Sequence, residues 1–194
     1  MRRVGVFGGT FDPPHLGHVA TALEIKHLLD LDEVLIVVAG DPWQKTGSTD
    51  ITPADVRLSL AERAFGGLDG ISVSDVEVNR PGASYMVDTL QDLNLSGERS
   101  LHLVVGSDAA AGLDTWHDPE QLKRLAKLIV VTRAGHEGRV PPDGWDYDVV
   151  DVPAFDISST EIRRRIASGE PYEGLVPRSV AAEIKSLPLY QDDR

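Results

Sequence analysis

This sequence predicts an α/β fold, with a doubly wound parallel sheet and helices on both of its faces. Short apolar runs recur along the chain and alternate with segments that carry helix start signals. The run at residues 34–39 is apolar on both faces, as is typical of a buried parallel strand. Strands that alternate with helices join through right-handed crossovers into a Rossmann-like sheet. With 194 residues, 41% of them hydrophobic, the chain suits one domain, residues 1–194.

Six strands are expected, each from one apolar run. They are predicted at residues 4–7, 34–39, 71–78, 101–105, 128–132 and 147–152. The third run is the least regular of the six. The first strand leads directly into the segment that carries the strongest functional signal. In a doubly wound sheet, ligands bind at the carboxyl ends of the strands, where the strand order reverses.

Two helix starts combine a capping side chain with a proline in the first turn. Thr52 precedes Pro53 at one of them, and Asp118 precedes Pro119 at the other. Both pairs predict that the capping side chain accepts a hydrogen bond from a backbone N–H of the first turn. Residues 135–144 are polar and rich in glycine and proline, which indicates an exposed loop.

The last two helices are also marked in the sequence. Ser158 and Glu161 have the spacing of a capping box, and Gly169 is placed to end that helix. Pro177 is expected to open the final helix. That helix carries its apolar residues on one side: Val180, Ala181, Ile184 and Leu187.

Composition excludes several classes of function. The net charge of −12 argues against broad binding to nucleic acid or to an anionic membrane, although small phosphorylated ligands need only a local cluster of donors. No apolar run approaches ~20 residues, so no membrane span is expected. The chain begins with a strand rather than a signal peptide, which predicts a cytoplasmic location. Cysteine is absent, which excludes disulfides and thiolate sites. The sequence does not determine the oligomeric state, and a homo-oligomer is one of the states that it allows.

Residues 8–18, Gly-Gly-Thr-Phe-Asp-Pro-Pro-His-Leu-Gly-His, lie where the first strand passes into the first helix. Gly8 and Gly9 allow the backbone to come close to a ligand. The helix N-terminus offers N–H groups and a partial positive charge to an anion. His15 and His18 can each donate a hydrogen bond to a phosphate oxygen. The segment therefore predicts a phosphate site.

A metal site is the alternative for this segment. Asp12, His15 and His18 could serve as ligands, with the helix starting near Gly17. That interpretation leaves the glycines unexplained, and it lacks an acid nearby that could activate a water molecule. The phosphate site is therefore the favoured interpretation, and no metal ligand is assigned.

A second anion-binding element is predicted at residues 157–163, Ile-Ser-Ser-Thr-Glu-Ile-Arg. The hydroxyls of Ser158 and Thr160 stand at a helix N-terminus. Arg163 falls on the second turn and can reach back over the start of the helix. The two arginines that follow point about 100° and 200° further round the helix and are expected to face solvent. A simple helix cap would explain Ser158 but not Arg163.

These two segments resemble the signatures of a nucleotidyltransferase superfamily. His15-Leu16-Gly17-His18 matches its His-x-Gly-His signature, and Ser158-Ser159-Thr160-Glu161-Ile162-Arg163 matches its Ser-x-Thr-x-x-Arg signature. Within the superfamily the chain is most similar to the bacterial nicotinate-mononucleotide adenylyltransferases, in a form similar to actinobacterial members. Further matching segments are Gly106-Ser107-Asp108, Thr115-Trp116, Arg133-Ala134-Gly135 and Leu189-Tyr190. The chain departs from the family pattern at Trp43, Met86, His117 and Ala134.

The resemblance implies transfer of the adenylyl group of ATP, as its Mg²⁺ complex, to nicotinate mononucleotide, which gives nicotinate adenine dinucleotide and pyrophosphate. It assigns catalysis to His15, His18 and Arg163. It assigns ATP binding to Gly8, Gly9, Thr10, Phe11, His15, His18, Gly106, Asp108, Arg133, Ile157, Ser158, Thr160 and Arg163. It assigns binding of the acceptor to Asp12, Lys45, Ser84, Tyr85 and Trp116, with Trp116 stacked on the pyridine ring.

Three alternatives stay open at this point. Nicotinamide mononucleotide or phosphopantetheine could replace nicotinate mononucleotide as the acceptor. The protein could be a nucleotide-binding regulator without catalysis, although such a regulator has no need of the full set of histidines and arginine. It could also be a metal-dependent hydrolase that uses Asp12, His15 and His18.

Overall fold

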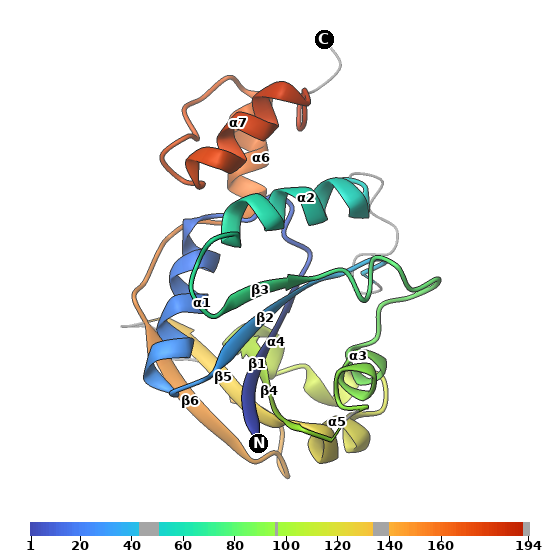
Figure 1. Cartoon of the computed structure of the whole chain (residues 1–194). Helices are drawn as coiled ribbons and strands as arrows, with labels where there is room; N and C mark the ends of the chain where they lie inside the picture. The colour runs from blue at the N-terminus through green and yellow to red at the C-terminus, as the bar shows by residue number, and fades with distance from the viewer. Residues whose placement is uncertain (43–50, 96, 134–139, 192–194) are drawn as a thin grey trace.

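The computed structural model of the chain describes residues 1–42, 51–95, 97–133 and 140–191. Its centre is a parallel sheet of six strands in the order β3-β2-β1-β4-β5-β6 (Figure 1). The strands are β1 (Arg2–Gly9), β2 (Glu33–Val38), β3 (Ile71–Ser74), β4 (Arg99–Gly106), β5 (Lys127–Arg133) and β6 (Tyr147–Val152). The doubly wound parallel sheet and all six predicted strands are confirmed.

Helices cover both faces of the sheet. They are α1 (Leu16–Leu28), α2 (Ala54–Phe65), α3 (Met86–Leu93), α4 (Ser107–Ala110), the 3₁₀ helix η2 (Leu113–Thr115), α5 (Pro119–Leu125), α6 (Ser159–Ala167) and α7 (Arg178–Ser186). Buried hydrophobic side chains form two core clusters, one on each face of the sheet. One cluster packs α1, α2, α6 and α7 against the sheet. The other packs α3, α4 and α5 against the opposite face. The result is a three-layer arrangement in which β1 and β4 lie at the centre (Figure 1).

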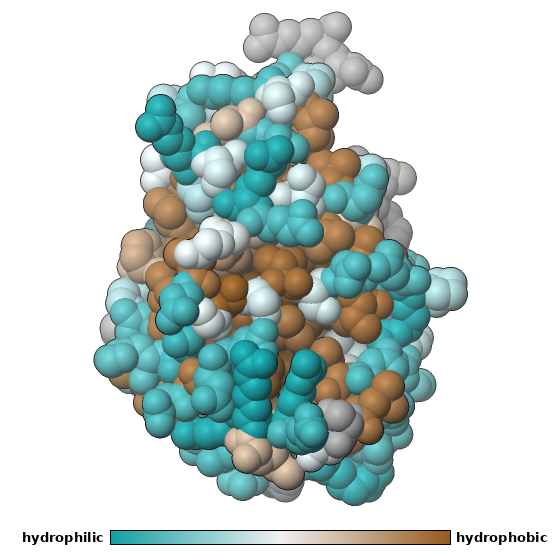
Figure 2. Space-filling view, viewed as in Figure 1, coloured by the Kyte–Doolittle hydropathy of each residue, from teal (hydrophilic) through white to brown (hydrophobic). Residues whose placement is uncertain are grey.

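The molecular surface is uneven in polarity. Figure 2, in the same view as Figure 1, shows hydrophilic side chains over the lower part of this face and hydrophobic atoms across its middle, around the edge strand β3. Among the helices that the structure describes, none is long and apolar enough to cross a membrane.

Several helix signals act as predicted. The side chain of Asp118 accepts from the backbone N–H of Gln121 at 3.1 Å and caps α5. Ser158 accepts from the N–H of Glu161 at 3.2 Å and caps α6. Gly169 follows the end of α6 with φ +70°, a left-handed conformation that glycine adopts without strain.

Other expectations were wrong in detail. The third strand ends at Ser74 rather than residue 78, because the chain turns after it: the N–H of Asn79 donates to the carbonyl of Asp75 at 2.9 Å. Thr52 does not cap α2: Pro53 occupies the cap position, and the backbone of Thr52 is bonded elsewhere. Leu187 lies past the end of α7 and is 40% exposed. The first helix does begin near Gly17, as predicted: its first residue is Leu16, and His15 is at its cap.

Candidate active site

The carboxyl ends of β1 and β4 border a cavity of about 190 Å³. The chain order of the sheet reverses between these two strands, which is where ligands bind in open α/β sheets. The walls include residues predicted for ATP (Gly8, Gly9, Thr10, Gly106) and residues predicted for the acceptor (Ser84, Trp116). Pockets for whole drug-sized ligands usually measure ~300–1,000 Å³. This cavity therefore has room for one part of the two expected ligands, such as a single ring, and not for both ligands.

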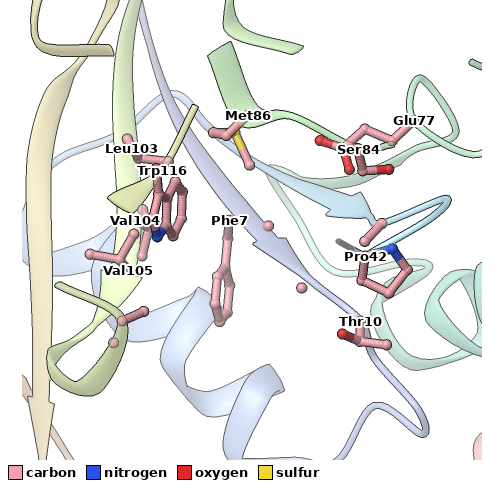
Figure 3. Close-up of a pocket in the computed structure, with 15 residues that line it drawn as sticks. Phe7, Thr10, Pro42, Glu77, Ser84, Met86, Leu103, Val104, Val105 and Trp116 are labelled. Carbon is pink, nitrogen blue, oxygen red and sulfur yellow. The ribbon is translucent and has the colours of Figure 1, made fainter. Parts of the chain in front are cut away.

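Figure 3 shows how the walls are arranged. The rings of Trp116 and Phe7 stand on one side, near Leu103–Val105 of β4, while Ser84 and Glu77 lie together on the other side. Met86 lies between the two sides, over the strand end that carries the glycines. The cavity therefore has an apolar, aromatic part and a separate polar corner.

The two glycines at the end of β1 lie close to neighbouring side chains. A Cβ atom at Gly9 would lie 2.9 Å from the ring of Phe11, and one at Gly8 would lie 2.6 Å from Cε of Met86. Both distances are shorter than real Cβ contacts allow. The glycines thus make room for neighbouring side chains, in addition to the close ligand approach predicted from the sequence.

His15 and His18 lie together at the start of α1. Their rings are stacked, with centroids 3.6 Å apart. The backbone N–H of His15 donates to Nδ1 of His18 at 3.2 Å, so in the neutral ring of His18 the proton is on Nε2. Phe11 has its ring 5.0 Å from that of His18 and is only 2% exposed. Its side chain therefore supports His18 from the core, and only its backbone can meet ATP.

The second signature segment docks onto the first. Ser159 Oγ donates to the carbonyl of Pro13 at 2.8 Å, and Arg163 Nη1 donates to the carbonyl of Asp12 at 2.7 Å. Both contacts link residues about 150 positions apart in the chain. Arg163 reaches back over the helix start, as its place on the second turn of α6 predicts.

Glu161 does not complete the expected capping box. Its carboxylate pairs with Arg164 and Arg165, which hold the pKa of Glu161 at about 2. Arg164 also pairs with Glu170. The two arginines after Arg163 therefore belong to an exposed network of ion pairs on the outside of α6.

Asp12 is buried beneath the loop rather than presented to a ligand. It is 3% exposed; Oδ1 accepts from the hydroxyl of Tyr190 at 2.6 Å, and Oδ2 accepts from the N–H of Thr52 at 3.2 Å. Both carboxylate oxygens thus bond to protein groups, which does not fit the predicted contact with the acceptor or the alternative role as a metal ligand. In the part of the chain that the structure describes, no group of three or more His, Asp or Glu residues could hold a metal ion.

Ser84 is likewise bonded within the protein. Its Oγ accepts from the backbone N–H groups of Gly40 at 2.9 Å and Asp41 at 3.1 Å, and its own N–H donates to the carbonyl of Asp41 at 2.9 Å. These bonds tie the loop after β2 to the segment before α3. The prediction that Ser84 binds the acceptor directly is therefore not supported, and Ser84 shapes the cavity wall instead.

Glu77 is a buried carboxyl in the polar corner that no sequence motif singles out. It is 3% exposed, and Oε1 accepts from Oγ1 of Thr89 at 2.7 Å. Burial raises the pKa of Glu77, an effect opposed by hydrogen bonds from the hydroxyls of Thr89 and Ser84. The two hydroxyls therefore offset part of the cost of burying the charged form of Glu77 next to the cavity.

Two of the positions at which the sequence departs from the family pattern, Met86 and His117, lie at or next to the cavity wall. Met86 lines the cavity together with Trp116. Tyr85, which precedes Met86, stacks on His117 with ring centroids 4.3 Å apart. The residues beside Met86 and Trp116 thus join the start of α3 to the segment after η2.

The remaining predicted residues are placed unequally. Gly106 ends β4 at the cavity, Asp108 is exposed in α4, and Ile157 is half-buried just before α6. Arg133 is the last residue of β5, but its side chain lies outside the described structure. Lys45 also lies outside the described residues, as do Trp43 and Ala134.

Arg57 is a central residue of this region that the sequence analysis missed. It is 1% exposed and donates to the carbonyls of Thr52, Thr10, Ala39 and Gly40 at 2.6–3.0 Å. A signal was present: Arg57 shares the helical spacing i, i+3, i+4 and i+7 with buried apolar residues of α2, Leu60, Ala61 and Ala64. An arginine on a buried face implies specific partners.

Comparison with known proteins places the chain. Residues 6–165 match the cytidylyltransferase-like family. A protein of Leifsonia xyli subsp. xyli is 40% identical over 191 residues, which cover 97% of this chain and 94% of that protein. One of Corynebacterium kroppenstedtii is 41% identical over 195 residues, covering 97% and 90%. Both bear the name "Probable nicotinate-nucleotide adenylyltransferase".

Solved structures share the fold. The nicotinic acid mononucleotide adenylyltransferase of Plasmodium falciparum, known in complexes with APC and with NaAD, superposes with a TM-score of 0.79 at 18% identity. The match covers 98% of each chain. The fold, the paired segments and the family match define the class: the chain belongs to the cytidylyltransferase-like nucleotidyltransferases. Within that class it belongs with the nicotinate-nucleotide adenylyltransferases, its full-length relatives at about 40% identity.

Proposed function

We propose that the protein transfers the adenylyl group of ATP to nicotinate mononucleotide. The acceptor's 5′-phosphate oxygen attacks the α-phosphorus, the bond from that phosphorus to the β-phosphate oxygen breaks, and pyrophosphate leaves with the electron pair. The product is nicotinate adenine dinucleotide. The observation that carries the proposal is the contact of Arg163 with the carbonyl of Asp12 at 2.7 Å, which brings the two signature segments together.

The chain's contribution to this reaction is alignment and charge neutralisation. The attacking phosphate is an anion near neutral pH, so no strong general base is needed. We assign His18, with its Nε2–H, to the α-phosphate, where negative charge grows in the transition state. His15 and the N-terminus of α1 bind the neighbouring phosphate oxygens. Arg163 and the hydroxyls at the start of α6 hold the β- and γ-phosphates of the leaving group.

The two nucleosides occupy opposite parts of the switch point. Gly106, Asp108 and Ile157 are assigned to the adenosine, and Asp108 accepts from the ribose hydroxyls. Trp116 stacks on the pyridine ring in the aromatic part of the 190 Å³ cavity. The N–H groups near Tyr85 are assigned to the nicotinate carboxylate. Arg133 is assigned to the phosphates of ATP and Lys45 to the acceptor.

ATP is proposed to enter as its Mg²⁺ complex. Mg²⁺ prefers phosphate oxygens and water, and the described residues offer no cluster of three carboxylate or histidine ligands that would hold it apart from the nucleotide. Asp12 is proposed to position the loop instead of binding a ligand. The cytoplasm, where ATP and pyridine mononucleotides are available, is the proposed location, and one domain is proposed to carry the whole activity.

The test is a comparison of acceptors. Purified protein is incubated with ATP and, in parallel, with nicotinate mononucleotide, nicotinamide mononucleotide or phosphopantetheine, and pyrophosphate release is measured. ATP labelled at the α-phosphate should transfer its label to the dinucleotide, whereas ATP hydrolysis would leave the label in AMP or ADP. We expect the highest kcat/KM with nicotinate mononucleotide, and loss of turnover in His18→Ala. Release with none of the three acceptors, or preference for phosphopantetheine, would overturn the proposal.

A further inference from the structure

Asp12 joins four segments of the chain at the phosphate site. Its carboxylate accepts from Tyr190 at 2.6 Å and from the N–H of Thr52 at 3.2 Å, and its carbonyl accepts from Arg163 at 2.7 Å. The loop after β1, the segment before α2, helix α6 and the segment after α7 thus meet at one residue. Of these contacts, the one from Tyr190 spans 178 positions of the chain.

Tyr190 is held in a conformation that needs support. Its φ is +61°, in the left-handed region that a bulky side chain rarely adopts. Together with Leu189 it packs against the core shared by α2, α6 and α7. Burial, followed by the charge of Asp12, raises the pKa of Tyr190, so the phenol keeps its proton and remains a donor. An O–H donor bonded to a carboxylate is among the stronger hydrogen bonds in proteins.

Any movement of Asp12 reaches both sides of the phosphate site. Pro13 and Pro14, whose φ angles are fixed, separate Asp12 from His15, so a shift of Asp12 also shifts His15. His15 in turn donates its backbone N–H to His18. Arg163 rests on the carbonyl of Asp12, so its guanidinium moves with the same residue.

We propose that Tyr190 is a positioning residue for adenylyl transfer: by holding Asp12, its hydroxyl sets the places of His15, His18 and Arg163. The segment after α7 is thereby part of the active site, although it touches no substrate. Trp116, which is assigned to the pyridine ring, lies in the segment after β4 and is not one of the residues that bond to Asp12. The inference rests on the proposed function for its reaction, but the geometry that it concerns is that of the phosphate site.

The first test is Tyr190→Phe, which removes the hydroxyl and keeps the ring. A displacement of the order of 1 Å costs up to about 100-fold in rate, so kcat should fall by about 10- to 100-fold. KM for nicotinate mononucleotide should stay within about two-fold of the wild type. The matched control is Tyr172→Phe, the same change at a tyrosine that is 9% exposed in the same core, and it should keep the wild-type kcat.

The second test is Asp12→Asn, alone and combined with Tyr190→Phe. If both residues act through one bond, the double variant loses no more activity than the more severe single variant. Additive losses, or a Tyr190→Phe protein that is folded by circular dichroism and keeps kcat within about two-fold of wild type, would overturn the proposal. If Tyr190→Phe does not fold, Asp12→Asn with the same kcat and KM readout decides it.

Failure of the proposed function would look different. In that case wild-type protein releases no pyrophosphate with any mononucleotide, and the affinity for α,β-methylene ATP is compared instead by calorimetry. Weaker binding in Tyr190→Phe than in Tyr172→Phe would support the positioning role independently of the acceptor. Equal binding in the two variants, or no binding by the wild type, would refute it.

Discussion

Arg57 is expected to be one of the most sensitive positions for stability. Its guanidinium donates four hydrogen bonds, to the loop after β1 (Thr10), the end of β2 (Ala39 and Gly40) and the segment before α2 (Thr52). Arg57→Met would leave these carbonyls without their donor and would remove a positive charge close to the buried carboxylate of Asp12. Breaking such a buried charged network costs about 3–5 kcal/mol.

That loss is large compared with the total free energy of unfolding of a domain. Domains are stable by about 5–15 kcal/mol, and at this chain length each kcal/mol moves the thermal midpoint by about 2–4 °C. Arg57→Met should therefore lower the midpoint by about 6–20 °C. Arg57→Lys is the matched control: it keeps the charge but lacks the planar fork, so we expect roughly half of the loss.

The assay is urea unfolding followed by circular dichroism, with the thermal midpoint as a second measurement. A loss below about 1 kcal/mol in Arg57→Met would refute the reasoning, because it would mean that water or other donors replace the guanidinium at no cost. Equal losses in Arg57→Met and Arg57→Lys would show that the hydrogen-bonding geometry, and not the charge, supplies the whole effect.

Three further predictions concern the cavity. Trp116→Ala should raise KM for nicotinate mononucleotide by about ten-fold or more, through lost ring stacking, and leave KM for ATP nearly unchanged. In Gly9→Ala the new methyl group would push against the ring of Phe11 and so disturb His18, which packs on that ring. Gly9→Ala should therefore lower kcat more than Gly8→Ala, in which the clash is with the flexible methyl end of Met86. Burial raises the pKa of Glu77, so its contribution to stability is complete below about pH 4 and is lost as pH rises through the raised pKa. Glu77→Gln should therefore gain stability relative to wild type between pH 4 and neutrality.

Each of these predictions can fail. An unchanged KM for the mononucleotide would remove Trp116 from the pyridine site. Equal kcat values for the two glycine variants would mean that the ring of Phe11 can shift without moving its neighbour. For Glu77, a difference in the free energy of unfolding between variant and wild type that stays the same at every pH would contradict the raised pKa.

Local signals in the sequence were sufficient for the architecture. Apolar runs identify the inner strands β2, β4 and β5 because a strand buried on both faces tolerates few polar residues. The edge strands β3 and β6 were identified from runs that also contain serine or aspartate. The caps at Asp118 and Ser158 were identified because a capping bond joins residues only three apart. The segment at residues 8–18 is predicted to bind phosphate because its glycines, prolines and histidines have no common structural explanation.

Long-range contacts were the part that the sequence could not supply. Thr52 has the composition of a cap, yet its backbone is bonded to Asp12 and Arg57, residues that only the fold brings to it. Ser84 looked like a ligand for the acceptor, and the structure gives its hydroxyl to the loop after β2. In each case a distant partner competes for the same polar group, and no local pattern records that competition.

The sequence by itself therefore determined the architecture and supplied the residue types that predict a phosphate site, since histidine, arginine and a helix start all offer hydrogen-bond donors to an anion. The tertiary structure decided which polar groups bond within the protein and which residues line the cavity. Asp12 and Tyr190 are 178 positions apart and meet only because the segment after α7 returns to the end of β1. Hydrogen bonds act over about 3 Å, and for residues so far apart in the chain only folding brings the two atoms to that distance.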